Sequence, residues 1–291
     1  MVRASPRDAR AHYELSRAYI GRGRMREGAA ELEIAIRLDP RFLPAYHALQ
    51  KYYRLTGRLD LELDILRRLA ALHTRDPQSY VRLGQINLGL YWLDDSNQAF
   101  QQALLLAPND PSVLRETAKC DWASGRSEEA VRRLQEARRL APDDAETTSF
   151  LAQYLLATGR APEAEVVLRE ALKQRPDDRL LTPVLIFNLV HQGGKHRFQE
   201  AVGLSQGYLR TNPPTAAVYC WLGRAYDGLD MPAEAEAAYQ NSVRLDPSFE
   251  NATYLLGRSY LRQGRTKQGQ RLISFYAQIS SHLQTYVHAE E

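Results

Sequence analysis

Apolar residues recur along this chain at spacings of three and four, in two short stretches that together repeat every 34 residues. Such spacings place the apolar side chains on one face of a helix, so each repeat predicts a pair of amphipathic helices. One step between repeats is 37 residues long. The repeats span residues 9–42, 43–76, 77–110, 111–144, 145–178, 179–215, 216–249 and 250–281.

Four positions, counted from the first residue of each repeat, keep one kind of side chain. Position 7 is leucine in seven of the eight repeats, and position 8 is small in six. Position 20, counted three residues later in the sixth repeat, is small in seven. Facing small residues let two helices approach closely, and a usually large residue at position 24 fills the space beside them. The pattern therefore predicts two closely packed helices in each repeat.

Glycines and acidic residues mark the ends of the predicted helices. Glycine at position 15 predicts that the first helix ends in a left-handed residue. Asp-Pro pairs at 76–77 and 110–111 predict N-caps. The three additional residues of the sixth repeat predict a lengthened turn within residues 191–197. The glycines that carry this prediction are Gly23, Gly57, Gly125, Gly159 and Gly264.

The seventh repeat carries the fullest set of these residues, namely Tyr219, Leu222, Gly223, Tyr226, Ala235, Tyr239 and Pro247. In this arrangement the chain resembles the tetratricopeptide repeat over residues 9–281. The resemblance implies an all-α fold, a right-handed α-solenoid superhelix of about eight antiparallel helix pairs. It also implies that the first helices line a concave groove, which holds a peptide or another segment of a partner protein.

The two ends of the chain differ from the repeats. Residues 1–8 predict an N-terminal tail. Residues 279–291 predict a capping helix and tail, because Ile279, Leu283, Tyr286 and Val287 keep helical spacing. One helix pair cannot bury both of its apolar faces, so repeats must stack and the ends need cover. We expect a single solenoid over residues 9–281.

The composition is that of a folded protein and excludes several classes. The 291 residues are 44% hydrophobic and 25% charged, unlike a disordered chain. The net charge of +3 is too small for coating nucleic acid through overall charge. Two distant cysteines, Cys120 and Cys220, exclude a disulfide framework and fit a reducing compartment. Because no stretch reads as a signal peptide or membrane span, we expect a cytoplasmic protein without membrane insertion.

No residue pattern typical of catalysis or cofactor binding occurs. The seven histidines are scattered without the four-residue spacing that places two on one metal, and we expect them at the surface. The segment from Gly193 to His196 lacks the first glycine and the Ser/Thr of a phosphate-binding loop. Aspartate pairs at 94–95, 143–144 and 177–178 predict helix caps. We therefore expect a non-enzymatic protein without metal or cofactor.

Positions 2, 5, 9 and 12 of each first helix would face the implied groove, because they share one helix face. These 32 positions carry eight basic and two acidic residues, and position 9 carries five cations and no anion. Such a line of charge favours an extended acidic segment, with Tyr13, Trp122 and Tyr254 as aromatic anchors. The alternative is that these cations only solvate an exposed face. The candidate groove residues are Arg10, Tyr13, Arg17, Lys51, Arg54, Arg115, Lys119, Trp122, Phe187, Arg224, Tyr254 and Arg258.

The middle of the implied groove is apolar, which leaves two interpretations open. An exposed apolar patch often marks a docking site, so the groove could have basic ends and an apolar centre. Alternatively, the register of the sixth repeat slips and these residues belong to the core. The residues concerned are Leu156, Leu180, Pro183, Phe187 and Val190.

Three functions are compatible with this sequence. The first is a protein-interaction scaffold that binds a protein or peptide partner, acidic and extended, in the groove. The second is the substrate-selecting repeat region of a larger transferase-type enzyme. The third is RNA binding on the basic face, against which the sparse aromatic residues argue. For the first, charge reversal at Lys51 and Lys119 is expected to weaken an acidic partner and to flatten its salt dependence.

Overall fold

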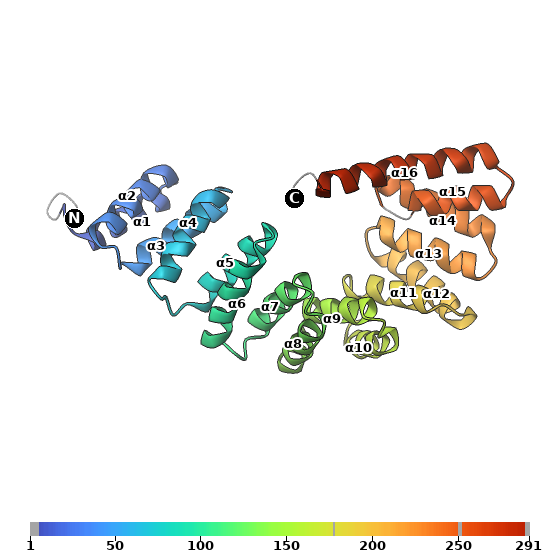
Figure 1. The fold of residues 1–291 in the computed structure, drawn as a ribbon, viewed down its shortest axis with the longest axis horizontal. Helices are drawn as coiled ribbons and strands as arrows, with labels where there is room; N and C mark the ends of the chain where they lie inside the picture. The colour runs from blue at the N-terminus through green and yellow to red at the C-terminus, as the bar shows by residue number, and fades with distance from the viewer. Residues whose placement is uncertain (1–5, 177, 250–251, 289–291) are drawn as a thin grey trace. The chain divides into compact units, whose positions relative to one another are not determined.

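The computed structural model describes residues 6–176, 178–249 and 252–288, and the side chains of the last helix as far as residue 277. Within these residues the chain forms sixteen α-helices and no strand (Figure 1). The first helices of the pairs are α1 (Ala9–Gly21), α3 (Leu43–Leu55), α5 (Pro77–Gly89), α7 (Pro111–Ala123), α9 (Ala145–Ala157), α11 (Leu181–Gln192), α13 (Ala216–Gly228) and α15 (Ala252–Arg262). The second helices are α2 (Met25–Leu38), α4 (Leu59–Ala71), α6 (Leu93–Leu106), α8 (Ser127–Leu140), α10 (Ala161–Gln174), α12 (Lys195–Thr211), α14 (Pro232–Leu245) and α16 (Thr266–His288).

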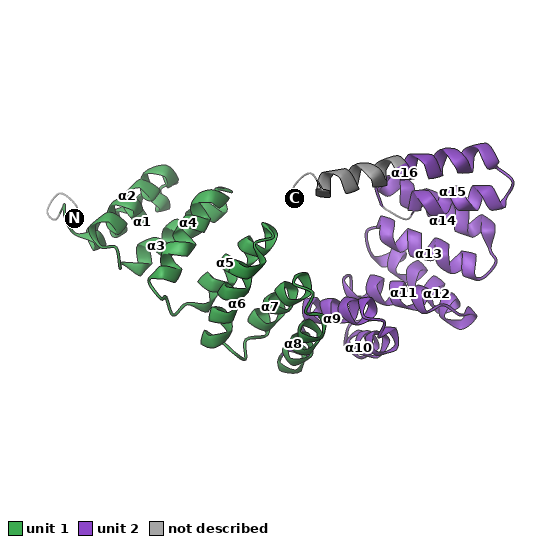
Figure 2. Ribbon diagram, in the orientation of Figure 1, with its two compact units in different colours: residues 1–140 green, residues 141–291 purple. Residues whose placement is uncertain are grey.

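The helices pack as consecutive pairs in two compact units, residues 1–140 and 141–291 (Figure 2). Inside each unit, a first helix packs on the second helix of its own pair and on the second helix of the pair before it. In unit 1, for example, α5 contacts both α6 and α4. The predicted all-α solenoid of helix pairs is confirmed, because each pair covers its apolar faces with its neighbours.

Small residues let the two helices of a pair pack closely. A Cβ atom built on Gly84 of α5 would lie 2.8 Å from the ring of Phe100 in α6, and one on Gly223 would lie 2.5 Å from the ring of Tyr239. Both rings belong to the large residues at position 24. The hydroxyl of Ser96, at position 20, also donates to the backbone carbonyl of Gly84 at 2.9 Å. The predicted contact between positions 8, 20 and 24 is confirmed.

The second repeat replaces the small pair with a polar one. Gln50 stands at position 8 and Glu62 at position 20, and the amide of Gln50 donates to the carboxylate of Glu62 at 2.6 Å. Arg82 of the next first helix donates to both oxygens of this carboxylate, at 2.8 Å each. Glu62 is only 1% exposed, so these hydrogen bonds replace the water that it loses on folding.

Position 15 is left-handed in every repeat. The five predicted glycines have φ between 69° and 78°, and Gly193 has φ 72°. In the third and seventh repeats the position is occupied by Tyr91 and Asp230, with φ 57° and 58°. The predicted N-caps also form, since Asp76 accepts from the backbone of Gln78 and Ser79, and Asp110 caps α7 in the same way.

The lengthened turn predicted in the sixth repeat is wrong. Only Gly193 and Gly194 separate α11 from α12, whereas three residues separate α1 from α2. The additional residues form one more turn at the start of α12, which is 17 residues long, compared with 14 in α2. Phe198 follows this turn, and its ring lies where a Cβ on Gly228 of α13 would be 2.3 Å away. The aromatic contact between the helices accounts for the longer helix.

The C-terminal residues extend the last helix. Residues 279–288 continue α16 without a break, and α16 begins at Thr266. The predicted capping contacts of Ile279, Leu283, Tyr286 and Val287 concern side chains outside the described residues. In the described part of the chain, no helix has both the length and the apolar content needed to cross a bilayer.

Candidate functional site

The twelve candidate residues lie on first helices of both units. Unit 1 carries eight of them on α1, α3 and α7, and unit 2 carries four on α11, α13 and α15. We call the surface formed by positions 2, 5, 9 and 12 the first-helix face of each unit. Each unit therefore has a first-helix face of its own, built by the same helical spacing.

The first-helix face of unit 1 is positively charged on α1 and α3. Arg10, Arg17, Lys51 and Arg54 are all exposed. Arg17 pairs with Glu14 at 3.1 Å, but both side chains are well exposed, so this ion pair is weak. Within the described residues Lys51 has no salt-bridge partner. These side chains are accessible to a bound segment.

The cations of α7 are partly neutralised by a buried carboxylate that the sequence did not reveal. Glu116 is only 4% exposed. It accepts from the ammonium of Lys119 at 2.8 Å and from the amide of Gln85 at 3.0 Å. The guanidinium of Arg115 lies 3.7 Å from its other oxygen. The positive charge of this helix is consequently smaller than the groove positions alone predict.

The first-helix face of unit 2 combines arginines with aromatic rings. The guanidinium of Arg224 lies 5.8 Å from the centre of the Trp221 ring, and Arg258 lies at the same distance from Tyr254. The Trp221 ring also packs against Phe187, with ring centres 4.7 Å apart. An arginine beside an aromatic face is attracted to the ring quadrupole and keeps its charge exposed to solvent. This arrangement can bind carboxylates beside an apolar surface.

The predicted aromatic anchors are half-buried. Tyr13 packs edge-on against Phe42, with ring centres 5.5 Å apart, and also touches the core of unit 1. Trp122 and Tyr254 are likewise of intermediate exposure. Trp221 was missed because it occupies position 6, beside the four positions assigned to the groove. Position 6 lies three residues before position 9 and is therefore next to it on the helix surface, which was the available signal.

The apolar residues assigned to the middle of the implied groove are only partly exposed. Leu156 and Val190 are buried, Phe187 is half-buried, and Leu180 is exposed. The register does not slip, because Leu185 at position 7 is buried in the sixth repeat, as Leu151 is in the fifth. The interpretation as an exposed docking patch is therefore wrong for Leu156 and Val190. The interpretation that the register of the sixth repeat slips is also wrong.

Buried charge is the feature that the sequence reasoning overlooked. Glu62, Glu116 and Asp121 are nearly inaccessible, yet each is bonded to arginine, lysine or glutamine side chains. Burial alone would raise the pKa of Glu62, but hydrogen bonds from Arg82 and Gln50 hold this pKa below its ordinary value. The sequence contained a signal for Glu62, because position 20 is small in the other repeats and packs against the partner helix. A glutamate at this position needs a hydrogen-bond partner.

The histidines and cysteines are the remaining residues that could bind a metal or act as nucleophiles. The described residues hold no cluster of three or more histidine, cysteine or acidic side chains that could bind a metal. Cys120 and Cys220 are buried free thiols, and burial raises the pKa of Cys220 to about 12. The expectation of surface histidines is wrong for His12, which is buried against Glu31 and the carbonyl of Pro6.

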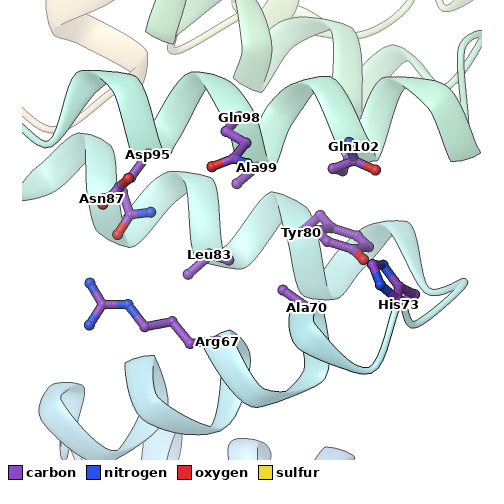
Figure 3. A pocket seen from close by; sticks show the side chains of 10 residues that line it. All are labelled: Arg67, Ala70, His73, Tyr80, Leu83, Asn87, Asp95, Gln98, Ala99 and Gln102. Atoms are coloured by element: carbon purple, nitrogen blue, oxygen red, sulfur yellow. The ribbon is translucent and has the colours of Figure 1, made fainter.

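A pocket of about 410 Å³ lies in unit 1 between α4, α5 and α6. Figure 3 shows Arg67, Asn87 and Asp95 toward one end and Tyr80 with His73 toward the other. The side chains that line it come from the opposite side of α5 to the first-helix face, since Tyr80 and Asn87 are at positions 4 and 11. Burial raises the pKa of the Tyr80 hydroxyl, which keeps it protonated at neutral pH.

Comparison with protein families assigns the repeats. Two family models, both described as tetratricopeptide repeat, match this chain. One matches residues 93–154 and 122–182, and the other matches residues 222–268. A search of curated proteins finds no match to the chain.

Solved structures share the fold at low sequence identity. A tetratricopeptide repeat protein from Parabacteroides merdae is 15% identical, with a TM-score of 0.63, and the match covers 86% of this chain and 98% of that one. The APC/C hetero-tetramer Cut9-Hcn1 is 19% identical over 88% of this chain and 50% of that one, with a TM-score of 0.64. YrrB, described as a protein with an unusual peptide-binding site, is 17% identical over 62% of this chain and 93% of its own, with a TM-score of 0.55.

Proposed function

The chain belongs to the tetratricopeptide-repeat family, and we propose that it is a non-catalytic scaffold whose first-helix faces bind an extended, acidic segment of a partner protein. A stack of helix pairs exposes a long surface made of many equivalent side chains. Such a surface suits an extended segment better than a small substrate, because each repeat adds similar contacts along the segment.

The charge at position 9 carries this proposal. The position holds cations in five repeats and no anion in any. Lys51 and Arg258 are exposed, and Arg224 is half-buried beside Trp221. Arginine binds carboxylates through paired hydrogen bonds, and the neighbouring rings supply rigid apolar contact area. The buried Glu116 limits the contribution of α7, so we assign the main electrostatic contacts to the other first helices.

Similarity of fold agrees with this assignment at a general level. YrrB is described as having a peptide-binding site, and we transfer only the class of ligand to this chain. The acidic nature of the segment is inferred from the cations of this chain alone. Their spacing along the first-helix face of each unit favours an extended anionic segment over a compact one.

Charge reversal on the first-helix faces tests the proposal. The probe is a fluorescein-labelled peptide of ten glutamates, with a ten-residue Gly-Ser peptide as the neutral reference, and anisotropy is measured from low to high salt. We expect Lys51→Glu and Arg258→Glu each to weaken glutamate-peptide binding roughly fivefold at low salt and to reduce its salt dependence. Lys173→Glu changes the net charge equally on the second helix α10, where Lys173 is exposed, and should leave the affinity unchanged.

Two outcomes would contradict the proposal. Equal affinity in the wild type and both first-helix variants would show that these cations do not contact the segment. Tighter, salt-dependent binding of a ten-nucleotide adenosine RNA than of the glutamate peptide, lost in the same variants, would favour RNA as the ligand instead.

A further inference from the structure

A tyrosine at position 11 links successive repeats in this chain. Tyr53, Tyr226 and Tyr260 occupy this position in the second, seventh and eighth repeats. Each hydroxyl pairs with a side chain on the second helix of the repeat before it: with Glu33 at 2.9 Å, Gln206 at 3.0 Å and Gln240 at 3.2 Å. The tyrosine side chain therefore spans the space between a first helix and the second helix of the preceding repeat.

The third repeat lacks this tyrosine and has a pocket at the same place. Asn87 stands at position 11, and Arg67 stands on α4 at the position that Glu33 holds on α2. Both side chains line the 410 Å³ pocket, at the same end in Figure 3. A volume of this size lies within the range of small ligand sites, roughly 300–1,000 Å³. The short amide in place of the ring accounts for the space.

Asn87 brings an unused hydrogen-bond acceptor to this pocket. Its side chain is only 2% exposed, and its Oδ1 atom has no hydrogen-bond partner among the described residues. The fourth repeat also lacks the tyrosine, but there the carboxylate of Asp121 accepts from Arg126 at 2.9 Å and Arg133 at 2.6 Å. A buried acceptor without a donor is unfavourable, so a ligand that donates to Asn87 gains the missing hydrogen bond.

An exposed apolar surface lies next to Arg67, one of the residues that line the pocket. Arg67 lies 5.3 Å from the ring centre of Trp92, in the turn between α5 and α6. Leu90, Tyr91 and Trp92 are 38%, 82% and 44% exposed, and they are consecutive. Tyr91 occupies the left-handed position 15 with φ 57°, where most other repeats have glycine. A bulky residue in this conformation is strained, and strain combined with exposed apolar side chains is typical of a contact surface.

We propose that the pocket between α4, α5 and α6 binds a tyrosine side chain of a partner polypeptide, with the phenol hydroxyl donating to Asn87 and the ring face next to the Arg67 guanidinium. The bound ring fills the space that the rings of Tyr53, Tyr226 and Tyr260 fill in their own repeats, but it enters in the reverse direction, with its hydroxyl toward position 11. The exposed run from Leu90 to Trp92 contacts the residues that flank the tyrosine. This site lies on the opposite side of α5 to the first-helix face and does not depend on the function proposed for that face.

A pair of matched peptides tests the site on the full chain. The probes are acetyl-Gly-Tyr-Gly-amide and its phenylalanine counterpart, and binding is followed by amide chemical shifts of the ¹⁵N-labelled protein. We expect shifts confined to α4, α5, α6 and the turns that join them, and a preference of about fivefold for tyrosine, which corresponds to one hydrogen bond. Asn87→Ala should remove the preference, and Asn241→Ala on α14 should retain it.

A second variant restores the pattern of the other repeats. Asn87→Tyr is expected to fill the pocket, abolish the binding of both peptides and raise the midpoint of thermal unfolding. Equal binding of the tyrosine and phenylalanine peptides to the wild type would overturn the proposal, as would shifts outside these three helices and the turns that join them. Binding of p-cresol without binding of the tyrosine peptide would also overturn it, since the site would then accept a free phenol and no polypeptide.

Discussion

Individual carboxylates, buried for Glu62 and half-buried for Glu165, connect the repeats of this chain. Glu62 in α4 accepts from Arg82 in α5, and Glu165 in α10 accepts from Gln192 in α11 at 2.6 Å. Each bond joins the second helix of one repeat to the first helix of the next. A buried charge is tolerated only when it is paired, so these residues make the correct stacking partner a condition of stability.

Removing the carboxylate of Glu62 should destabilise the folded chain. Glu62→Ala leaves Arg82 and Gln50 without their partner, and we expect the free energy of unfolding to fall by about 3 kcal/mol. Glu27→Ala breaks the exposed pair with Arg24 and should leave the free energy of unfolding nearly unchanged. Urea denaturation of both variants measures the difference, and equal losses would contradict this role for Glu62.

The loss of stability caused by Glu62→Ala should be greater at neutral pH than in acid. The pKa of Glu62 in the folded chain lies below its ordinary value of 4.5. A lowered folded pKa means that the carboxylate contributes its full stabilisation above pH 4.5 and loses it as the pH falls through the folded pKa. The difference between wild type and Glu62→Ala should therefore be largest near neutral pH and should shrink in acid.

At the scale of the helix pair, the sizes of the residues that face each other set the distance between the two helices. Gly223 in α13 faces the ring of Tyr239 in α14, and Tyr239 is completely buried. Burial and the neighbouring Asp227 raise the pKa of Tyr239, which keeps its hydroxyl protonated and donating to Asp227 at 2.9 Å. The close approach therefore positions both an apolar contact and a hydrogen bond.

Two glycine substitutions in unit 2 should have opposite effects. Gly223→Ala places a Cβ 2.5 Å from the Tyr239 ring, and we expect a loss of about 1–3 kcal/mol from overpacking. Gly203→Ala in α12 meets nothing within 4 Å, and its better helix propensity should add about 0.5–1 kcal/mol. Thermal unfolding of the two variants compares them directly. A stabilising Gly223→Ala would show that the helices can separate at little cost.

At the scale of the molecule, stability is local, because each repeat contacts mainly its sequence neighbours. Within each unit the second helices pack on the first helices of the next pair, and the cores of the two units consist of separate sets of residues. In such an array, stability is approximately a sum of repeat and neighbour terms. Damage in one repeat is therefore expected to weaken its neighbours first.

Hydrogen exchange of the full chain tests this locality. Glu62→Ala should accelerate amide exchange in α3, α4 and α5, which carry its partners, and leave α13 and α14 unchanged. Gly223→Ala should give the reverse pattern, with faster exchange in α13 and α14. Equal acceleration throughout the chain in either variant would mean that the chain unfolds as one cooperative unit.

Local features of the fold followed from the sequence. The 34-residue period, the small positions 8 and 20 and the left-handed position 15 depend on helix geometry and backbone conformation, which short spacings encode. The sixth repeat was predicted less well, because the same three residues could lengthen a turn or a helix. Packing of Phe198 over Gly228 favours the helix, and this contact joins segments about thirty residues apart.

The candidate site depended on contacts that spacing does not encode. The basic first-helix face could be listed from the sequence, since helical periodicity assigns residues to a face. The partial neutralisation by Glu116, the stacking of Arg224 on Trp221 and the pocket beside Asn87 were not evident there. Each arises where side chains of different helices meet, and the energy of such a contact depends on its distance and burial. The chain's periodicity thus specifies which surfaces exist, and packing specifies which of their charges and spaces stay accessible.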